Sequence, residues 1–348
     1  MNKRQALRHI YAPPKGKGGW RLEDLVGHPG IRYFSFGRHA LLHGLVAAGV
    51  GRGDRVLLPA MVCRDLLAPL NALGVEPAYY QVTKRLEPVL DANLPAAKAI
   101  VAIDYFGFPQ DLTGFLHYCR RTGAILVEDN AQGFMSRDGE GLFLGTRGDI
   151  GIISLRKTLP VPDGALLLAG SKIAAHLPPQ IPFEGSAPLS FLLKQAARRL
   201  APLTGVAPLV YATKTARLLR RLRTGYEIEP SGVKGEQRMA EREAPSVKLF
   251  SRLYALDILH EARRRRELYI FVLGLIKGSP CEPLFDGLPD RVVPFGFPFY
   301  ARPGDIPIVK KRLGEYRLEC FPWPELPRTV EPVAPDHYRN LWIVRFLW

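Results

Sequence analysis

The sequence predicts an α/β fold with a large domain, in which helices cover a mainly parallel sheet, and a small C-terminal α+β domain. Residues 31–170 alternate short apolar, β-branched runs with stretches of helical periodicity. This alternation is typical of parallel sheets, because two parallel strands need a long crossover connection between them, usually a helix. Beyond residue 246, a helical pattern is followed by short apolar runs that indicate strands.

The elements of the large domain follow from their local patterns. A helix is expected over residues 37–49, at the end of a loop. Apolar and β-branched runs predict strands over residues 55–58, 77–82, 99–105 and 124–128. Helical spacing predicts two further helices, over residues 65–73 and 112–121, and Gly74 is a typical terminator for the first of them.

Four segments are expected along the chain. They are an N-terminal arm over residues 1–30, the large α/β domain over 31–180, a basic helical insertion over 181–245 and the small domain over 246–348. Proline-interrupted, strongly basic stretches such as FLLKQAARRLAPL distinguish the insertion. In the small domain one helical pattern covers residues 246–276 and a short helix is expected near 308–316. The apolar stretches VVPFGFPFY and RLECFPWPELP suggest its β part.

Composition restricts the classes of partner. The chain of 348 residues is 47% hydrophobic, so it can bury a full core. Lys and Arg outnumber Asp and Glu by 48 to 33, a formal net charge of +15. This excess favours anionic partners such as phosphorylated cofactors, nucleotides, acidic lipids or nucleic acid. Because no zinc-finger or RNA-recognition motif is recognisable, specific nucleic-acid binding is not expected.

The cysteine pattern and the N-terminus indicate a cytoplasmic protein. The four cysteines are widely spaced and form no CxxC pair, which fits a reducing compartment and gives no metal site. His39 and His43 share a helix face without an HExxH pattern, so they are interpreted as site-lining or structural residues. The N-terminus lacks the apolar core of a secretory signal, and no later apolar run is long enough to span a bilayer.

A candidate anion-binding loop precedes the first expected helix. A cofactor that carries a phosphate, a pyridine ring and an aldehyde needs such a loop, together with a carboxylate and a lysine. In SFGRHAL (residues 35–41), Gly37 permits close backbone approach, and the helix N-terminus directs free N–H groups at a phosphate. Arg38 can add a bidentate contact. The alternative is an ordinary turn, since a glycine before a helix is common.

A candidate carboxylate follows an apolar strand in ILVEDNAQ (residues 125–132). The C-terminal ends of parallel strands form the edge where open α/β sheets bind ligands, so Asp129 is placed to pair with a pyridine nitrogen. An ionised carboxylate there keeps the ring protonated and able to accept electrons. Alternatively, Glu128 and Asp129 cap the next turn, as acids after a strand often do.

A candidate lysine, Lys157, lies in IISLRKTLPVPDGA (residues 152–165), between a short apolar strand and a proline-rich turn. This position suits imine formation with an aldehyde, because burial beside a cation such as Arg156 lowers a lysine pKa towards neutrality. The alternative is a solvated loop lysine, which is the commoner fate of lysines.

In combination, these segments resemble a known family. Residues 37–41, Gly107 with Pro109, residues 128–132 and residues 154–164 are similar to the successive motifs of the DegT/DnrJ-type sugar aminotransferases. That family has the aspartate-aminotransferase-like fold of enzymes that depend on pyridoxal 5'-phosphate (PLP). The resemblance covers residues 34–168 well and the C-terminal part more loosely, so it implies this fold and makes residues 31–180 the PLP-binding domain.

The resemblance also implies roles for individual residues. Lys157 would hold PLP as a Schiff base and carry the proton during tautomerisation. Asp129 would pair with the pyridine nitrogen, and Gln132 would lie near the ring hydroxyl. The remaining cofactor-binding candidates are Gly37, Arg38 and Ser154 around the phosphate, His39 beside them, and Cys63 where many members stack an aromatic ring.

Several positions depart from the family pattern. The family usually has a small hydroxyl residue where Arg38 stands, and Ser154 lies closer to Lys157 than usual. The usual GEGG run reads PDGA over residues 162–165. The basic insertion replaces a segment that in most members completes the active site of the partner subunit.

The function that the resemblance implies is amino transfer. An amino donor such as glutamate would supply nitrogen to a keto sugar, nucleotide-linked in our interpretation, during polysaccharide or secondary-metabolite biosynthesis. A homodimer is expected, because the family builds each site from two subunits. The alternative is a non-catalytic scaffold or sensor that retains the fold.

The basic insertion suggests a further interpretation, weak contact with anionic membranes. Its leucines alternate with a larger number of basic side chains, as in helices that lie on a membrane surface. The competing interpretation, which we favour, is a solvated helix face or a dimer contact, because runs of charge are commonly just solvated.

Overall fold

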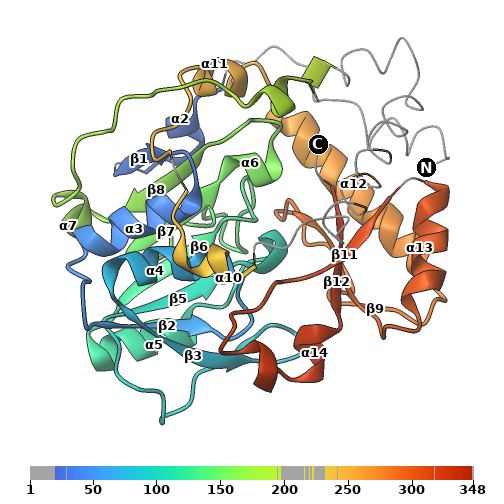
Figure 1. Ribbon diagram of the computed structural model, residues 1–348, viewed down its shortest axis with the longest axis horizontal. Coiled ribbons are helices and arrows are strands. Elements are labelled where there is room, and N and C mark those ends of the chain that lie inside the picture. Colours follow the sequence, from blue (N-terminus) through green and yellow to red (C-terminus); the bar gives the residue numbers. More distant parts are fainter. Residues whose placement is uncertain are drawn as a thin grey trace.

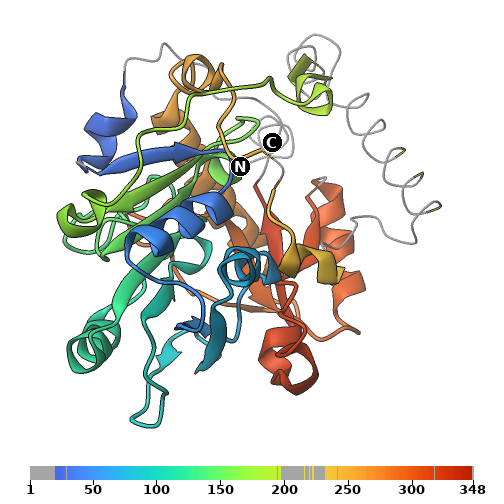
Figure 2. The same ribbon diagram turned by 60° about the vertical axis from the view of Figure 1, so that its left-hand side comes forward.

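Two sheets organise the part of the chain that the structure describes, as the ribbon diagrams show (Figures 1 and 2). The structure is a computed structural model that describes residues 20–28, 30–193, 195–196, 215, 219, 222, 232–240, 242–316 and 318–346. The larger sheet is built from elements before residue 170, coloured blue to green. The smaller sheet and its helices, orange to red, gather on one side of it.

Eight strands of the described residues form the larger sheet, in the order β1-β8-β7-β6-β5-β2-β3-β4. In chain order they are β1 (Ile31–Phe34), β2 (Arg55–Pro59), β3 (Glu76–Val82), β4 (Pro88–Val89), β5 (Ala99–Ile103), β6 (Ile125–Asn130), β7 (Ile150–Ser154) and β8 (Ala165–Ala169). All contacts from β7 through β6, β5 and β2 to β3 are parallel, whereas β8 and β4 pair antiparallel with their neighbours. The predicted α/β fold with a mainly parallel sheet is therefore confirmed.

Helices connect these strands and cover the sheet. In chain order they are α2 (Leu22–Val26), α3 (Gly37–Ala47), η1 (Arg64–Leu66), α4 (Leu67–Leu73), η2 (Tyr105–Gly107), α5 (Thr113–Thr122), α6 (Leu155–Thr158) and α7 (Ser171–Ala174). Helix α3 packs on β7 and β8, and α5 packs on β5 and β6. After the insertion, α10 (Gly232–Gln237) packs against α4.

Local sequence explains where these elements begin and end. Every residue of β5, sequence AIVAI, is buried, as expected for a central strand covered on both faces. The strand was expected to reach Tyr105 but ends at Ile103, because Phe106 adopts a left-handed φ of 58° in η2. Helix α4 ends as predicted at Gly74, whose φ of 68° suits a residue without a Cβ.

Four strands of the described chain form the smaller, antiparallel sheet, in the order β11-β12-β10-β9. The strands are β9 (Glu282–Pro283), β10 (Gly296–Tyr300), β11 (Cys320–Pro322) and β12 (Leu341–Arg345). The helices of this part are α12 (Ile258–Ile276), α13 (Ile306–Glu315), η3 (Glu331–Val333) and α14 (Asp336–Arg339), whereas α11 (Leu249–Leu253) lies beside α2 and packs with residues of the larger sheet (Figure 1). Helix α12 packs on β10 and α13.

The expectation of one helix over residues 246–276 was wrong, because α11 and α12 are separate. The carboxylate of Asp257 accepts a hydrogen bond from His260 N at 2.8 Å and caps the start of α12. An aspartate in this position stabilises the first free N–H groups of a new helix and favours a break in the chain before it.

Most of the predicted basic insertion lies outside the described residues, as do residues 1–19 of the expected N-terminal arm. Five of its leucines are described and are more than a third exposed: Leu189, Leu192, Leu193, Leu219 and Leu222. Membrane contact by this segment stays a prediction. Within the described chain, no helix combines the length and the apolar character that crossing a bilayer requires.

Helix α12 joins the two sheets through a buried ionic cluster. Glu261, Arg264 and Arg265 are at most 1% exposed, and Glu261 binds both guanidinium groups at 2.7 Å. Arg265 also donates to Thr158 O at 2.7 Å and to Phe295 O at 3.0 Å, so it holds α6 and the start of the smaller sheet to one helix. Burial lowers the pKa of Arg265 to about 10, so its charge persists at neutral pH.

Replacing Arg265 should therefore be strongly destabilising. In Arg265→Met the carboxylate of Glu261 loses a partner, and Thr158 O loses its donor. Breaking a buried ion pair in this way costs about 3–5 kcal/mol. Urea unfolding monitored by circular dichroism should show this loss, whereas Arg263→Met, the same change at an exposed position of α12, should be nearly neutral. Equal losses in the two variants would contradict this account of the cluster.

Candidate functional site

A cavity of about 430 Å³ opens where β6 and β7 end, at the N-terminus of α3. Parallel strands present their C-terminal ends at one edge, which is why the cavity forms there. Residues from the smaller sheet close it, including Phe295, Trp323 and Arg345. Pockets for small organic ligands span roughly 300–1,000 Å³, so a substituted aromatic ring with a phosphate fits this volume.

The N-terminus of α3 forms one wall. Its N-cap is Phe36, which makes no side-chain cap hydrogen bond, and no acidic residue lies in its first turn. The helix therefore presents free N–H groups and its positive dipole end to the cavity, an arrangement that binds anions. A Cβ at Gly37 would lie 3.3 Å from Ile152 Cγ2, so glycine allows the helix to start close to β7.

Lys157 lies in α6, directly after β7. Gly151 in β7 allows the backbone at Gly145, in the preceding loop, to approach the strand closely. A Cβ at residue 151 would lie 1.7 Å from Gly145 O. Burial lowers the pKa of Lys157; Asp129 and Cys63 raise it in part, and Arg156 lowers it further. More of the amine is therefore neutral near pH 7 than in a solvated lysine, and a neutral amine is the nucleophilic form.

Asp129 lies near the end of β6 and faces the same cavity. Burial raises its pKa, whereas the charge of Lys157 and a 2.9 Å hydrogen bond from Ala131 N lower it. Successive strand residues face opposite sides of a sheet, and Glu128 accordingly points away and binds Arg147 Nε at 2.7 Å. Of the two acids that the sequence offered, only Asp129 is a cavity residue.

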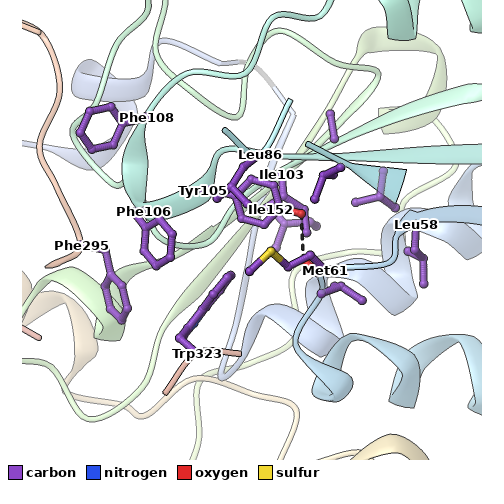
Figure 3. Packing of buried hydrophobic residues seen from close by; sticks show 14 of the residues in the cluster. Leu58, Met61, Leu86, Ile103, Tyr105, Phe106, Phe108, Ile152, Phe295 and Trp323 are labelled. Carbon is purple, nitrogen blue, oxygen red and sulfur yellow. Dashed lines mark hydrogen bonds between the residues drawn. The ribbon is translucent and has the colours of Figure 1, made fainter. Parts of the chain in front are cut away.

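Gln132 lines the cavity and also fixes the aromatic turn next to it. Its side-chain oxygen accepts a hydrogen bond from Phe106 N at 2.9 Å. The ring of Phe106 contacts Trp323, with centroids 4.6 Å apart, and Figure 3 shows these rings beside Phe295 and Met61. The peptide bond from Trp323 to Pro324 is cis. The η2 turn, which contains Phe106, thus connects the larger domain to Trp323, which closes the cavity from the smaller domain.

Cations gather near the α3 wall. Arg38 Nη2 lies 3.2 Å from Asp65 Oδ2, and Arg38 Nη1 donates to Arg238 O at 3.2 Å. The guanidinium of Arg156 lies 5.0 Å from the ring centre of Phe36. Desolvation lowers the pKa of Arg156, and the charge of Arg38 adds to this effect, so the two cations are close neighbours. An anion between them would relieve their repulsion.

The structure brings seven of the eight sequence-predicted site residues to one cavity: Gly37, Arg38, Cys63, Asp129, Gln132, Ser154 and Lys157. His39 is the exception. It lies two positions after Gly37, about 200° around the helix. Its Nε2 consequently lies 3.0 Å from Ala240 O, in the segment that follows α10. His43 on the same face contacts the carboxylate of Glu243 and stacks on Phe34, so both histidines make structural contacts.

Sequence reasoning missed several cavity residues, namely Phe36, Asp65, Phe295, Glu325 and Arg345. Phe36 adjoins the predicted loop and could have been included from its position. The three from the smaller domain carried no signal, because nothing in their local sequence indicates which part of the larger sheet they will meet.

The residues present fit a phosphorylated pyridine aldehyde. The uncapped helix end with Arg38 and Arg156 suits a phosphate, the Asp129 carboxylate suits a ring N–H, and the Lys157 amine suits an aldehyde. No group of three or more His, Cys, Asp or Glu side chains among the described residues is arranged to hold a metal ion.

Comparison with solved structures identifies the fold. An aminotransferase from Helicobacter pylori, PseC, involved in the biosynthesis of pseudoaminic acid, superposes with a TM-score of 0.63 at 13% identity, over 99% of this chain and 91% of that one. A DegT DnrJ EryC1 StrS aminotransferase from Brucella abortus gives 0.60 at 16% identity, over 93% and 82%. The predicted aspartate-aminotransferase-like fold is thus confirmed.

Sequence comparison identifies relatives of the larger domain. The chain is 31% identical to the dTDP-4-dehydro-2,3,6-trideoxy-D-glucose 4-aminotransferase of Saccharopolyspora spinosa over 165 residues, 44% of this chain and 42% of the relative. It is 31% identical to the L-glutamine:2-deoxy-scyllo-inosose aminotransferase of Streptomyces kanamyceticus over 149 residues, 41% and 35%. The chain therefore spans less than half the length of the curated relatives it matches.

The matched part of the chain contains most of the cavity. The sequence model of the DegT/DnrJ/EryC1/StrS aminotransferase family matches residues 21–171, which include Gly37, Cys63, Asp129 and Lys157. The resemblance predicted from the motifs is confirmed over these residues, which are similar to the DegT/DnrJ/EryC1/StrS aminotransferase family.

Proposed function

We propose that the chain is a PLP-dependent aminotransferase that transfers an amino group from an amino acid such as glutamate to a keto sugar. One observation carries the proposal: Lys157 and Asp129 face the same cavity, next to an uncapped helix N-terminus. Two curated relatives are named as aminotransferases that act on a dehydro sugar and on an inosose, which supports the acceptor class.

The residues of the cavity divide the work of holding the cofactor. We assign the phosphate to the N-terminus of α3 with Arg38, Arg156 and Ser154, the ring nitrogen to Asp129, and the covalent attachment to Lys157. Bound in this way, PLP supplies an electron sink for the substrate carbon that carries the amine. Lys157 Nζ would remove the proton from that carbon and later return it. Its lowered pKa allows the amine to accept and donate a proton near neutral pH.

The non-catalytic scaffold is the weaker alternative. A scaffold needs the fold but has no use for a buried lysine and a buried carboxylate that perturb each other's pKa in one cavity. The buried charges cost stability, so their presence favours a catalytic role.

The active form that we propose is a homodimer, the assembly implied by the family resemblance. Size-exclusion chromatography with light scattering should give a mass twice that of the 38.8 kDa chain. A monomer at micromolar concentration would contradict this part of the proposal.

The cofactor assignment predicts a spectroscopic difference between wild type and Lys157→Ala. Wild type mixed with PLP should develop a visible absorption band, and borohydride reduction should leave a pyridoxyl group on the Lys157 peptide in mass spectrometry. Lys157→Ala should show neither and should lose amino transfer by about 10²- to 10⁴-fold. The control Lys172→Ala removes an exposed lysine of α7 and should behave like wild type. A wild type without the band would favour the scaffold.

The electrostatic coupling of the pair predicts a shift in pH dependence for Asp129→Asn. The Asp129 charge raises the pKa of Lys157, so removing it should lower that pKa further. The rate at which Lys157 captures PLP rises with the neutral amine, so its midpoint should move to lower pH. Stopped-flow measurement of the band across a pH series tests this. Asp290→Asn, at a fully exposed position, should leave the midpoint unchanged, and an upward shift in Asp129→Asn would refute the coupling.

A further inference from the structure

A segment of the chain between α10 and α11 lies against the start of α3. We call residues 238–240 and 242–246 the strap, which Figure 1 shows in yellow-orange. Ser35 N donates a hydrogen bond to Glu243 O at 2.8 Å, and Ser35 Oγ donates to Arg242 O. Ser35 is fully buried and directly precedes the N-cap of α3. The strap therefore fixes the backbone that leads into the proposed phosphate site.

The strap also holds the turn between α6 and β8. Asp163 lies in this turn and is 1% exposed. Arg242 Nη2 forms an ion pair with its Oδ2, and Ser246 donates to its Oδ1 from N at 3.3 Å and from Oγ at 3.1 Å. The next residue, Gly164, donates from N to Ser35 O at 2.8 Å. The turn and the start of α3 are thus bound to each other and to the strap.

Arg242 is the strap residue at which these two sets of contacts meet. Its carbonyl oxygen accepts from Ser35, and its guanidinium binds Asp163. The other terminal nitrogen, Nη1, donates to Ser186 O at 3.3 Å. A Cβ at Gly185 would lie 2.7 Å from this nitrogen, so glycine allows the chain to pass close to the guanidinium. The position of the arginine is therefore fixed from several sides.

Asp163 depends on this cation because its carboxylate is buried. An ionised carboxylate without a partner is strongly unfavourable in such surroundings. Asp163 also acts electrostatically on Arg156, one of the two cations assigned above to the phosphate. Without Arg242, the carboxylate would attract Arg156 and would compete with the phosphate for it.

We propose that Arg242 positions the cofactor site: it neutralises Asp163 and holds the start of α3 at a fixed separation from the Lys157 amine. A ligand held at both ends, through a phosphate and through an aldehyde, depends on this separation. A ligand held through the aldehyde alone does not. Arg242 acts through Ser35 and Asp163, so it is a positioning residue. The inference rests on the cofactor assignment of the proposed function.

The test compares PLP with pyridoxal, which has the same ring and aldehyde but no phosphate. In Arg242→Met the dissociation constant of PLP, from titration of the absorption band, should rise about tenfold to hundredfold, because the phosphate loses charge-assisted hydrogen bonds. The value for pyridoxal should stay within about twofold of wild type. Arg242→Lys, which keeps the charge, should recover part of the PLP affinity. Arg302→Met removes an exposed arginine of the smaller domain and is the control that should match wild type.

A double variant tests the part that Asp163 plays. When Asp163→Asn is added to Arg242→Met, the unpaired carboxylate is removed, so part of the PLP affinity should return. Equal weakening of PLP and pyridoxal in Arg242→Met would instead indicate a general loss of structure and would overturn the inference. So would a double variant that binds PLP more weakly than Arg242→Met alone.

Hydrogen exchange separates this inference from the proposed function, because it requires no cofactor. In unliganded Arg242→Met, peptides that cover residues 31–41 and 158–166 should both exchange faster than in wild type, since the amides of Ser35 and Gly164 lose protection. If wild type captures neither PLP nor pyridoxal, the cofactor assignment is wrong. If it captures both and these peptides are unchanged in Arg242→Met, only the role of Arg242 is wrong.

Discussion

The structure depends on one buried ionic cluster, in which Glu261 binds Arg264 and Arg265 inside α12. Arg265 donates at once to Thr158 O, next to Lys157, and to Phe295 O, next to β10. Arg264 donates to Phe346 O at 2.8 Å, just after β12. Each charge is unfavourable alone in such an environment, and each hydrogen bond has demanding geometry. The cluster therefore determines how the smaller sheet lies against the larger one, and with it the shape of the cavity.

The chemistry of the cavity depends on opposite charges that lie close together with little access to water. Asp129 raises the pKa of Lys157 and Lys157 lowers that of Asp129, so each side chain limits the desolvation of the other. Neither effect cancels burial completely, which leaves an amine that is more often neutral than usual. Arg38 and Arg156 repel each other at the α3 wall, where a phosphate would be favourable. Binding of an anionic ligand at this site would therefore also balance its positive charges.

Sequence reasoning found the parts of the site that follow directly from strands. Asp129 and Lys157 could be predicted because each follows an apolar run, and β-strand ends meet at one edge of a parallel sheet. His39 was placed in the site by proximity in sequence, but helix rotation turns it towards Ala240. Arg345 could not be found as a cavity residue, because its position depends on how the two domains pack, and that packing is fixed by contacts such as Arg265 with Thr158. Asp257 is a typical N-cap residue and could have indicated the start of α12. The helical periodicity continues across it, however, and therefore suggested a single helix.

The close approach of Gly151 to Gly145 O also bears on how this chain can evolve. Any side chain at residue 151 would displace the loop at residue 145, and with it Ile153, whose side chain lies against Gly145. The chain shares as little as 13% identity with solved structures of the same fold, so this fold is compatible with very different sequences. At residue 151 any side chain would place a Cβ 1.7 Å from Gly145 O, so no conservative replacement is available there. We therefore expect glycine to be required at this position of β7, just before Lys157, even where other positions of the chain tolerate substitution.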